Sequence, residues 1–160
     1  MRSLTFLFFL ILVGGCTTTK TLVLETPKRG EEFSSISIVA NNPTVDMPKD
    51  ITETFENSLR DKIYGSGKFE RGEDLKLLYT FISYEEGDRF MRWFFGGVGG
   101  AGEGSVTILV KYVNINDETR GKTQVESTLS AGFLGGSINK AAEKAAHEVA
   151  EYTFQNFKNK

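Results

Sequence analysis

The sequence predicts an α+β domain, a two-layer sandwich in which two helices cover one face of an antiparallel sheet. Apolar residues recur every four positions over residues 51–63, and a second stretch at helical spacing covers residues 138–153. Between these stretches lie three segments in which apolar and polar residues alternate, as in half-buried strands. A fourth alternating segment precedes the first helix. The expected order is therefore strand, helix, three antiparallel strands, helix, with both helices on one face.

The first predicted strand covers residues 33–40, and Asn41-Asn42-Pro43 ends it. In the helix that follows, Asp46 can act as the N-cap, Pro48 suits the first turn and Gly65 suits the end. The apolar stripe that would cover the sheet consists of Ile51, Phe55, Leu59 and Ile63.

Three consecutive strands are predicted next. Their residues expected to face the helices are Leu75, Leu77, Tyr79, Phe81, Val106, Ile108, Val110, Tyr112, Val125 and Leu129. Residues 116–121 have the composition of a turn, in which Gly121 is free to take a positive φ. The last helix begins at Ser137, a suitable cap. It is expected to bury Ile138, Ala141, Ala142, Ala145, Val149 and Tyr152 or Thr153.

The first sixteen residues have the order of a secretory signal. Arg2 supplies a positive charge, residues 4–13 are apolar apart from Thr5, and two glycines lead into Cys16. This stretch is shorter than the roughly 20 apolar residues that a membrane-spanning helix needs. Residues 12–16 resemble a bacterial lipobox. The resemblance implies that residues 1–15 are a signal peptide, that Cys16 receives a diacylglyceryl thioether, and that its new amine is acylated, typically with palmitate.

Lipidation of Cys16 would anchor the protein in the cell envelope, because two or more acyl chains, at about 0.8 kcal/mol per buried methylene, hold a protein stably in a membrane. Cys16 is the only cysteine, so the mature domain can form no internal disulfide. Thr17 stands where an Asp would favour the inner membrane, so we expect the outer membrane, with the protein facing the periplasm. Residues 16–32 are expected to form an extended tether, with Leu22-Val23-Leu24 closest to the domain, and residues 33–160 a single domain.

The composition argues against nucleic acid as a partner and against further membrane spans. The formal net charge is −2, and the basic residues are spread along the chain rather than gathered in a patch. After Val13 no apolar run approaches spanning length. The lipid is therefore expected to be the membrane attachment.

Residues 33–157 resemble a family of bacterial lipoproteins known only as a domain of unknown function, number 4410. The resemblance rests on the order of four features: the glycine-rich residues 96–102, the strand at 105–110, the turn at 117–121, and Gly132-Phe133-Leu134-Gly135-Gly136 before a terminal helix rich in Ala and Glu. It implies a fold and a location in the envelope, and it brings no catalytic residues.

No constellation in the sequence predicts an enzyme, a metal or a cofactor. Residues 97–102 match G-x-G-x-x-G, but the dinucleotide fingerprint needs a helix after it, and here a strand is predicted. His147 is the only histidine, and Glu143 and Glu151 at helical spacing place it on the solvated side of the last helix. A zinc site or a Cys/His catalyst would lack ligands, and no G-x-S-x-G nucleophile elbow occurs.

Two polar clusters could bind calcium, which prefers several oxygen ligands. One contains Glu85, Glu86 and Asp88 beside Arg89. The other is the turn of Asn114, Asn116, Asp117 and Glu118. Neither has EF-hand spacing, so solvated loops are the preferred interpretation of both.

The most informative feature is the aromatic run at residues 89–95, which leads into the glycines. In an up-and-down meander, this loop and residues 132–136 leave the same end of the sheet, and the turn at Asp117 lies at the other end. The candidate contact residues are Phe90, Trp93, Phe94, Phe95, Phe133 and Leu134. Two interpretations remain open. These side chains fold back over the edge of the core, or they form an exposed patch for a partner protein or the membrane interface.

The leading hypothesis from the sequence is a non-enzymatic, lipid-anchored envelope module that binds or assembles with other envelope proteins. A second hypothesis is a cell-wall hydrolase, which would need acids such as Glu85 and Asp88 to converge in a cleft. A third is a subunit of an oligomeric pore or secretion assembly.

Overall fold

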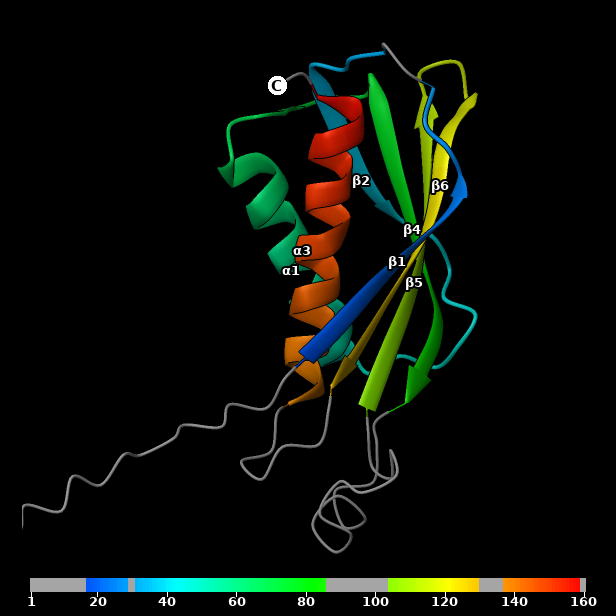
Figure 1. Cartoon of the computed structure of the whole chain (residues 1–160). Coiled ribbons are helices and arrows are strands. Elements are labelled where there is room, and N and C mark those ends of the chain that lie inside the picture. The colour runs from blue at the N-terminus through cyan, green and yellow to red at the C-terminus, as the bar shows by residue number, and fades with distance from the viewer. Residues whose placement is uncertain (1–16, 29–30, 86–103, 130–136, 159–160) are drawn as a thin grey trace, which may run out of the picture.

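The structure, a computed structural model, describes residues 17–28, 31–85, 104–129 and 137–158. They form a six-stranded sheet with two helices packed together on one face, which confirms the predicted two-layer α+β architecture (Figure 1). The strand order is β1-β6-β5-β4-β2-β3. The elements are β1 (Thr17–Glu25), β2 (Ser35–Ala40), α1 (Lys49–Gly65), β3 (Glu70–Arg71), β4 (Leu75–Glu85), β5 (Gly104–Asn114), β6 (Thr119–Leu129) and α3 (Ile138–Phe157). Neither of these helices is long and apolar enough to cross a membrane.

The sheet is mixed, so the prediction of a wholly antiparallel sheet was wrong. β4, β5 and β6 are antiparallel neighbours, as predicted. β2, however, runs parallel to β4, with Ile36 opposite Leu75 and Ala40 opposite Tyr79. The reason is that α1 connects these two strands, and a crossover through a helix returns the chain parallel to the strand that it left.

The segment predicted to be a tether is largely part of the domain. Residues 17–25 form β1, an edge strand that pairs antiparallel with β6 over eight residue pairs, from Thr17 opposite Leu129 to Glu25 opposite Lys122. The expectation that this segment is extended was correct, but it is hydrogen-bonded into the sheet from its first described residue. Its threonines are β-branched and suit a strand, although their polarity suggested a linker.

The core lies between the helices and the sheet. The predicted α1 stripe of Ile51, Phe55, Leu59 and Ile63 is buried, and the ring of Phe55 lies 5.0 Å from that of Tyr79, centroid to centroid. On α3 all the predicted residues are buried, and so are Ala146, Ala150, Phe154 and Phe157. The small alanines bring the backbone of α3 close to its neighbours, and the two phenylalanines extend the core toward the C-terminal end of the helix.

Two of the predicted local signals hold and two do not. The hydroxyl of Ser137 accepts a hydrogen bond from the backbone N–H of Asn139 at 3.2 Å, so it caps α3 as predicted, and α1 ends at Gly65 as predicted. The N-cap of α1 is Pro48 and not Asp46. In the turn it is Asp117, and not Gly121, that has a positive φ, at 58°.

Gly121 has a different role from the one predicted. It lies within β6, opposite Tyr112. A Cβ atom at this position would come within 3.3 Å of the ring of Phe157 and of Pro27. The sheet, the end of α3 and the segment that follows β1 therefore pack closely around Gly121, and a larger residue here would have to displace Phe157 or Pro27 by a few tenths of an ångström.

Two core tyrosines are held in their neutral form. Burial raises the pKa of the Tyr112 hydroxyl well above its usual value. Its hydroxyl donates to Thr153 Oγ1 at 3.0 Å, because Thr153 uses its own proton on the carbonyl of Val149. Burial, together with a hydrogen bond to the Glu56 carboxylate, likewise raises the pKa of Tyr79.

We predict that the free energy of unfolding falls above pH 10 and that Tyr112→Phe makes this fall less steep. The folded-state pKa of Tyr112 lies above its unfolded value, so its contribution is complete below pH about 10 and is lost as the pH rises toward the folded-state value. Over that range one such group contributes a slope of about 1.4 kcal/mol per pH unit. Chemical denaturation followed by circular dichroism between pH 8 and 11 measures it. An identical slope in both proteins would contradict the prediction.

Candidate functional site

Five chain positions meet at one end of the sheet, which we call the Thr17 end. Thr17 begins β1 opposite Leu129, the last residue of β6. Gly104, the first residue of β5, also lies opposite Leu129, and Ser105 lies opposite Glu85, the last residue of β4. The capped start of α3 lies at this end too (Figure 1).

This arrangement fixes where the two glycine-rich segments attach. Residues 86–103 connect the end of β4 to the start of β5, and residues 130–136 connect the end of β6 to α3. Both connections therefore leave from the Thr17 end, as predicted, whereas the turn at residues 115–118 lies at the opposite end, which we call the far end (Figure 1). The contact residues Phe90, Trp93, Phe94, Phe95, Phe133 and Leu134, together with Cys16, lie outside the described residues.

β1 is fixed to the domain by side chains as well as by its backbone. Thr19 Oγ1 lies 3.3 Å from Ser127 Oγ on β6, and Thr21 Oγ1 donates to Glu148 on α3 at 2.7 Å. The strand therefore contacts both layers. Its second half carries the exposed side chains of Leu22, Val23 and Leu24, which are 57%, 46% and 46% exposed. They belong to the sheet edge, as part of the domain.

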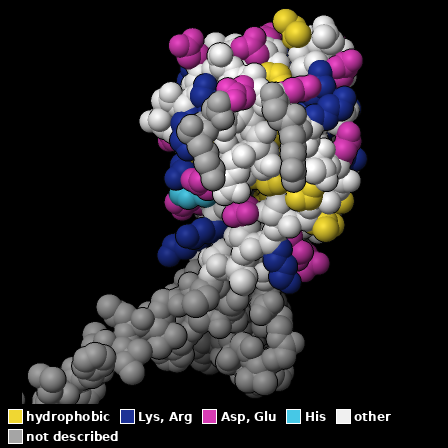
Figure 2. All heavy atoms as spheres, turned by 45° about the horizontal axis from the view of Figure 1, so that its top comes forward, with side chains coloured by type: hydrophobic (Ala, Val, Ile, Leu, Met, Phe, Trp, Pro, Cys, Tyr) yellow, Lys and Arg dark blue, Asp and Glu magenta, His cyan; other side chains and the backbone are white. Residues whose placement is uncertain are grey.

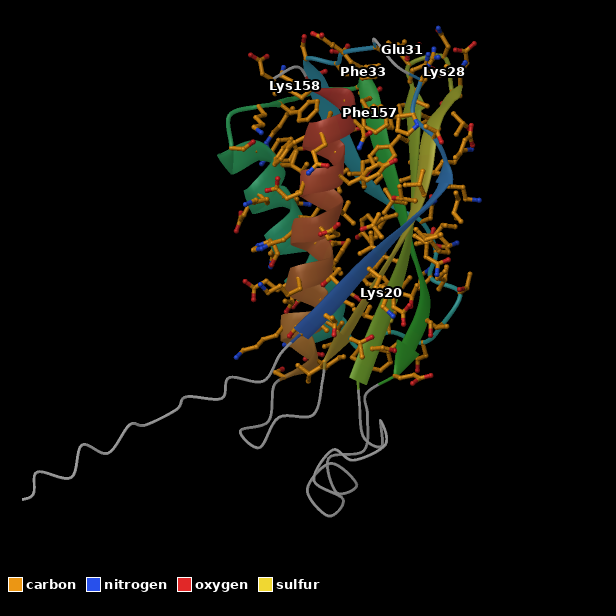
Figure 3. All side chains as sticks on the ribbon, in the orientation of Figure 1. Lys20, Lys28, Glu31, Phe33, Phe157 and Lys158 are labelled. Atoms are coloured by element: carbon orange, nitrogen blue, oxygen red, sulfur yellow. The ribbon has the colours of Figure 1, made fainter. Side chains whose placement is uncertain are left out.

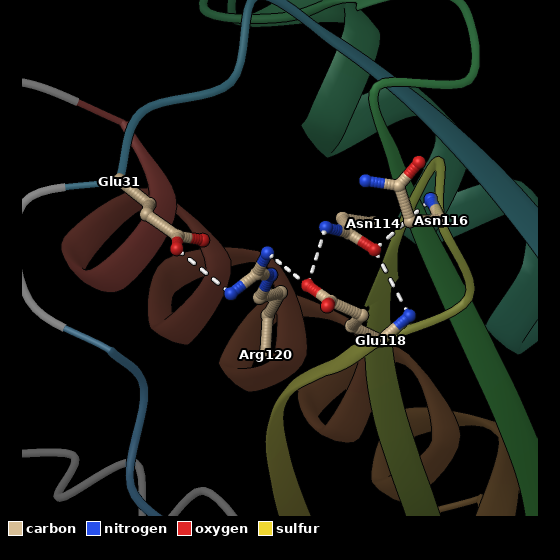
Figure 4. Close-up of polar contacts among 5 residues, drawn as sticks. All are labelled: Glu31, Asn114, Asn116, Glu118 and Arg120. Carbon is tan, nitrogen blue, oxygen red and sulfur yellow. Dashed lines mark hydrogen bonds and ion pairs between the residues drawn. The ribbon is translucent and has the colours of Figure 1, made fainter.

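At the far end, Arg120 ties the segment that follows β1 to the turn between β5 and β6. Its guanidinium group lies 2.8 Å from the Glu31 carboxylate and 2.6 Å from that of Glu118 (Figure 4). The arginine side chain is only 12% exposed, so this pairing is shielded from solvent more than a surface ion pair is. We call Glu31, Arg120 and Glu118 the clasp.

A second contact holds the same segment. The backbone N–H of Phe33 donates to the carbonyl of Phe157 at 3.2 Å, and the two rings lie 6.1 Å apart. Figure 3 shows Phe33, Phe157, Lys158 and Glu31 together at the far end. The clasp therefore holds Glu31, and the aromatic pair holds Phe33, so the chain between β1 and β2 is attached to the domain at two residues.

In the turn that the sequence suggested as a calcium site, side-chain oxygens of Asn114 and Glu118 interact with groups of the protein itself. Asn114 Oδ1 accepts the backbone N–H groups of Asn116 and Glu118 at 3.1 and 2.9 Å. The Glu118 carboxylate accepts from the Asn114 amide at 3.2 Å and pairs with Arg120 (Figure 4). Asn114 is buried, so the interpretation as a solvated loop was wrong for this residue. The cluster organises the turn and supplies the carboxylate to which the arginine binds.

The other candidates do not gather into a site within the described part of the chain. Glu85 is exposed at the end of β4, and Glu86 and Asp88 lie outside the described residues. His147 is half-buried on α3, and no group of three or more His, Cys, Asp or Glu among residues 17–28, 31–85, 104–129 and 137–158 could hold a metal ion. The G-x-G-x-x-G segment is followed by β5, a strand, so the helix that the dinucleotide fingerprint requires is missing at Gly104–Asn114.

A shallow hollow lies elsewhere, between the C-terminal halves of the helices. Lys62 and Glu151 line it and form an ion pair at 3.3 Å. Lys68, at its border, lies 4.5 Å from the centre of the Phe154 ring. Glu85 lies at the opposite end of the molecule, so it does not face this hollow, and Asp88 lies outside the described residues.

We predict that Glu31→Gln loosens the N-terminal segment. The substitution removes one carboxylate of the clasp and leaves the Arg120–Glu118 pair, so we expect the free energy of unfolding to fall by about 0.5–1 kcal/mol. We also expect the substitution to speed amide hydrogen exchange more in residues 17–34 than in α1. Lys49→Ala is the matched control, because Lys49 is 88% exposed in its pair with Glu53. Unchanged exchange in residues 17–34 would show that the clasp does not hold the segment.

Comparison with known proteins gives a fold and no family. No family model matches the sequence, and no curated protein matches it significantly, so the resemblance to the 4410 family is not confirmed. Among solved structures, a variant of the PelC dodecamer from Paraburkholderia phytofirmans is similar with a TM-score of 0.58, at 11% identity over 84% of this chain and 94% of that one. A Xanthomonas campestris protein of the DUF330 family model gives 0.49, at 16% identity over 82% and 91%. A minor lipoprotein from Acinetobacter baumannii gives 0.38, at 11% identity over 79% and 98%. The chain therefore shares its fold with PelC.

Proposed function

We propose that this protein is a lipid-anchored, non-enzymatic cell-envelope protein that binds or assembles with other envelope proteins. In this proposal the lipid is on Cys16, and the protein lies on the outer membrane and faces the periplasm. The observation that carries the proposal is the position of Thr17. The residue after the lipobox cysteine is the first residue of β1, and both glycine-rich segments leave from the same end of the sheet.

The positions of the described polar groups support a role without catalysis. The turn carboxylate of Glu118 is engaged by Arg120, the hollow between the helices contains a paired Lys62 and Glu151, and Glu85 is exposed at the end of a strand. A cell-wall hydrolase would instead need Glu85 to face a second acid across a cleft.

A second candidate function is a subunit of an oligomeric envelope pore or secretion assembly. The observation that favours it is the shared fold with PelC, which forms a dodecamer. Native mass measurement of the lipidated protein in detergent distinguishes a ring of many copies from a monomer that recruits other proteins.

The anchor is tested by Cys16→Ser. We expect the variant to lose incorporation of labelled palmitate and to move from the membrane fraction to the aqueous fraction, because the sulfur that carries the diacylglyceryl group is gone. Thr17→Ser, which keeps the cysteine, should fractionate like the unmodified protein. A Cys16→Ser variant that remains fully in the membrane fraction would refute lipid anchoring through this residue.

The partner contact is tested by Trp93→Ser combined with Phe94→Ser. We expect the circular dichroism spectrum and thermal midpoint to stay unchanged and crosslinking to other envelope proteins in cells to be lost. Ile115→Ser is the control, since Ile115 is an apolar residue, 65% exposed, at the far end. Unfolding of the double variant would assign the two aromatic side chains to the core, and unchanged crosslinking would exclude them from the contact.

A further inference from the structure

We propose that the Thr17 end rests directly on the surface of the bilayer that holds the lipid of Cys16. The strands then stand away from the membrane, and the turn at Asp117 is the part farthest from it. This inference rests on the proposed lipidation of Cys16 and adds an orientation to it. The partner that it assigns to the Thr17 end is the headgroup layer of a phospholipid membrane.

The connection between Cys16 and the sheet is short. A flexible tether of n residues reaches about 5–6 Å × √n, so a linker of 16 residues would let a domain move by roughly 20 Å. Here Cys16 is bonded directly to Thr17, which is already paired with Leu129 in the sheet. Adjacent Cα atoms lie about 3.8 Å apart. The start of β1 therefore cannot leave the headgroup layer by more than the length of one residue and the glycerol linkage.

β1 is held along its whole length, so it cannot detach and act as a longer linker. Detaching it would break eight residue pairs with β6 and the hydrogen bond from Thr21 to Glu148. The chain beyond β1 is fastened again by Glu31 to Arg120 and by Phe33 to Phe157. The short connection is therefore a stable property of the fold.

The Thr17 end carries many small hydroxyl side chains. The residues that flank the chain positions at the Thr17 end are mainly small hydroxyl residues, namely Thr17, Thr18, Ser105, Thr128 and Ser137. Such groups can exchange hydrogen bonds between water and lipid phosphate or ester oxygens without desolvating a charge. The charged residues at this end come in both signs. They are Glu85 on β4, Lys140 on α3 and, at the start of α1, Lys49 and Asp50, the latter 3.5 Å from the side-chain amide of Asn139.

The far end also carries charged residues, several of them in ion pairs. The clasp and the pair of Lys76 with Asp117 lie there. Figure 2, in which the far end is turned toward the viewer, shows acidic and basic side chains spread over that surface. At about 3.4 Å per residue, the 11 residues of β5 place the far end roughly 35 Å from the bilayer surface.

The orientation can be measured with single cysteines, because lipidation uses the sulfur of the only native cysteine. Lys140→Cys places a thiol near the Thr17 end, and Asn116→Cys places one in the far turn; both positions are exposed. Each lipidated full-length variant is labelled with an environment-sensitive fluorophore and incorporated into phosphatidylcholine vesicles that contain a headgroup-attached nitroxide quencher. We expect several-fold stronger quenching at position 140 than at position 116.

A linker variant tests the reason for this orientation. Insertion of about 16 residues of Gly and Ser after Cys16, with Thr kept as the first inserted residue, should leave the protein on the vesicles and remove most of the quenching at position 140. Equal quenching at the two positions in the uninserted protein would overturn the proposal, and so would quenching at 140 that the linker does not change. Protein that fails to associate with vesicles while Cys16 is intact would instead contradict the proposed lipid anchoring, so the two failures can be told apart.

Discussion

The pairing of β1 with β6 is the constraint on which the rest of the arrangement depends. It begins at Thr17, opposite Leu129, and so joins the residue that follows Cys16 to the end of the strand from which residues 130–136 depart. Any force or restraint applied at Cys16 therefore reaches the whole sheet. The clasp and the Phe33–Phe157 contact complete this connection at the far end, because they prevent the chain after β1 from lifting off the turn and α3.

Much of the fold could be predicted because its signals are local and periodic. The four-residue repeat from Ile51 to Ile63 identified α1 and its buried face, and Ser137 identified the start of α3. Strict alternation identified β4 and β5. β1 was missed because its stability depends on β6, about 100 residues away in sequence, and not on an apolar pattern of its own. The two residues of β3 are too few to produce any pattern.

The residues of the candidate site were likewise only partly predictable from the sequence. Cys16 and the two glycine-rich segments are recognisable in sequence because each consists of adjacent residues, and the alternation of the strands was enough to place both segments at one end. The clasp was not predictable, since Glu31 and Arg120 are far apart in sequence and either could pair with many other charged residues. Gly121 illustrates the limit of turn rules. It stands beside a turn, but Phe157 and Pro27, which pack tightly against it, come from distant parts of the chain.

The two edges of the sheet differ in a way that bears on assembly. At the other edge, the short strand β3 pairs with Ser35 and Ile36 of β2. Arg60 and Tyr64 of α1 donate to the carbonyls of Ile38 and Ile36, so β3 and α1 together occupy positions that an added strand would need. The β1 edge carries the exposed Leu22, Val23 and Leu24, and such an edge is a template for pairing with another chain. Antiparallel pairing of two β1 strands centred on Val23 would bring these apolar residues together.

That pairing would also place the two Thr17 residues at opposite ends of the joined strands, roughly 40 Å apart at about 3.4 Å per residue. Two copies that both stand with the Thr17 end on one membrane cannot satisfy this geometry. The proposed anchoring through Cys16 would therefore leave the open edge to a strand of another protein or to a copy in a different orientation. In that proposal, the short link between lipid and sheet limits pairing between copies as well as setting the direction in which the domain faces.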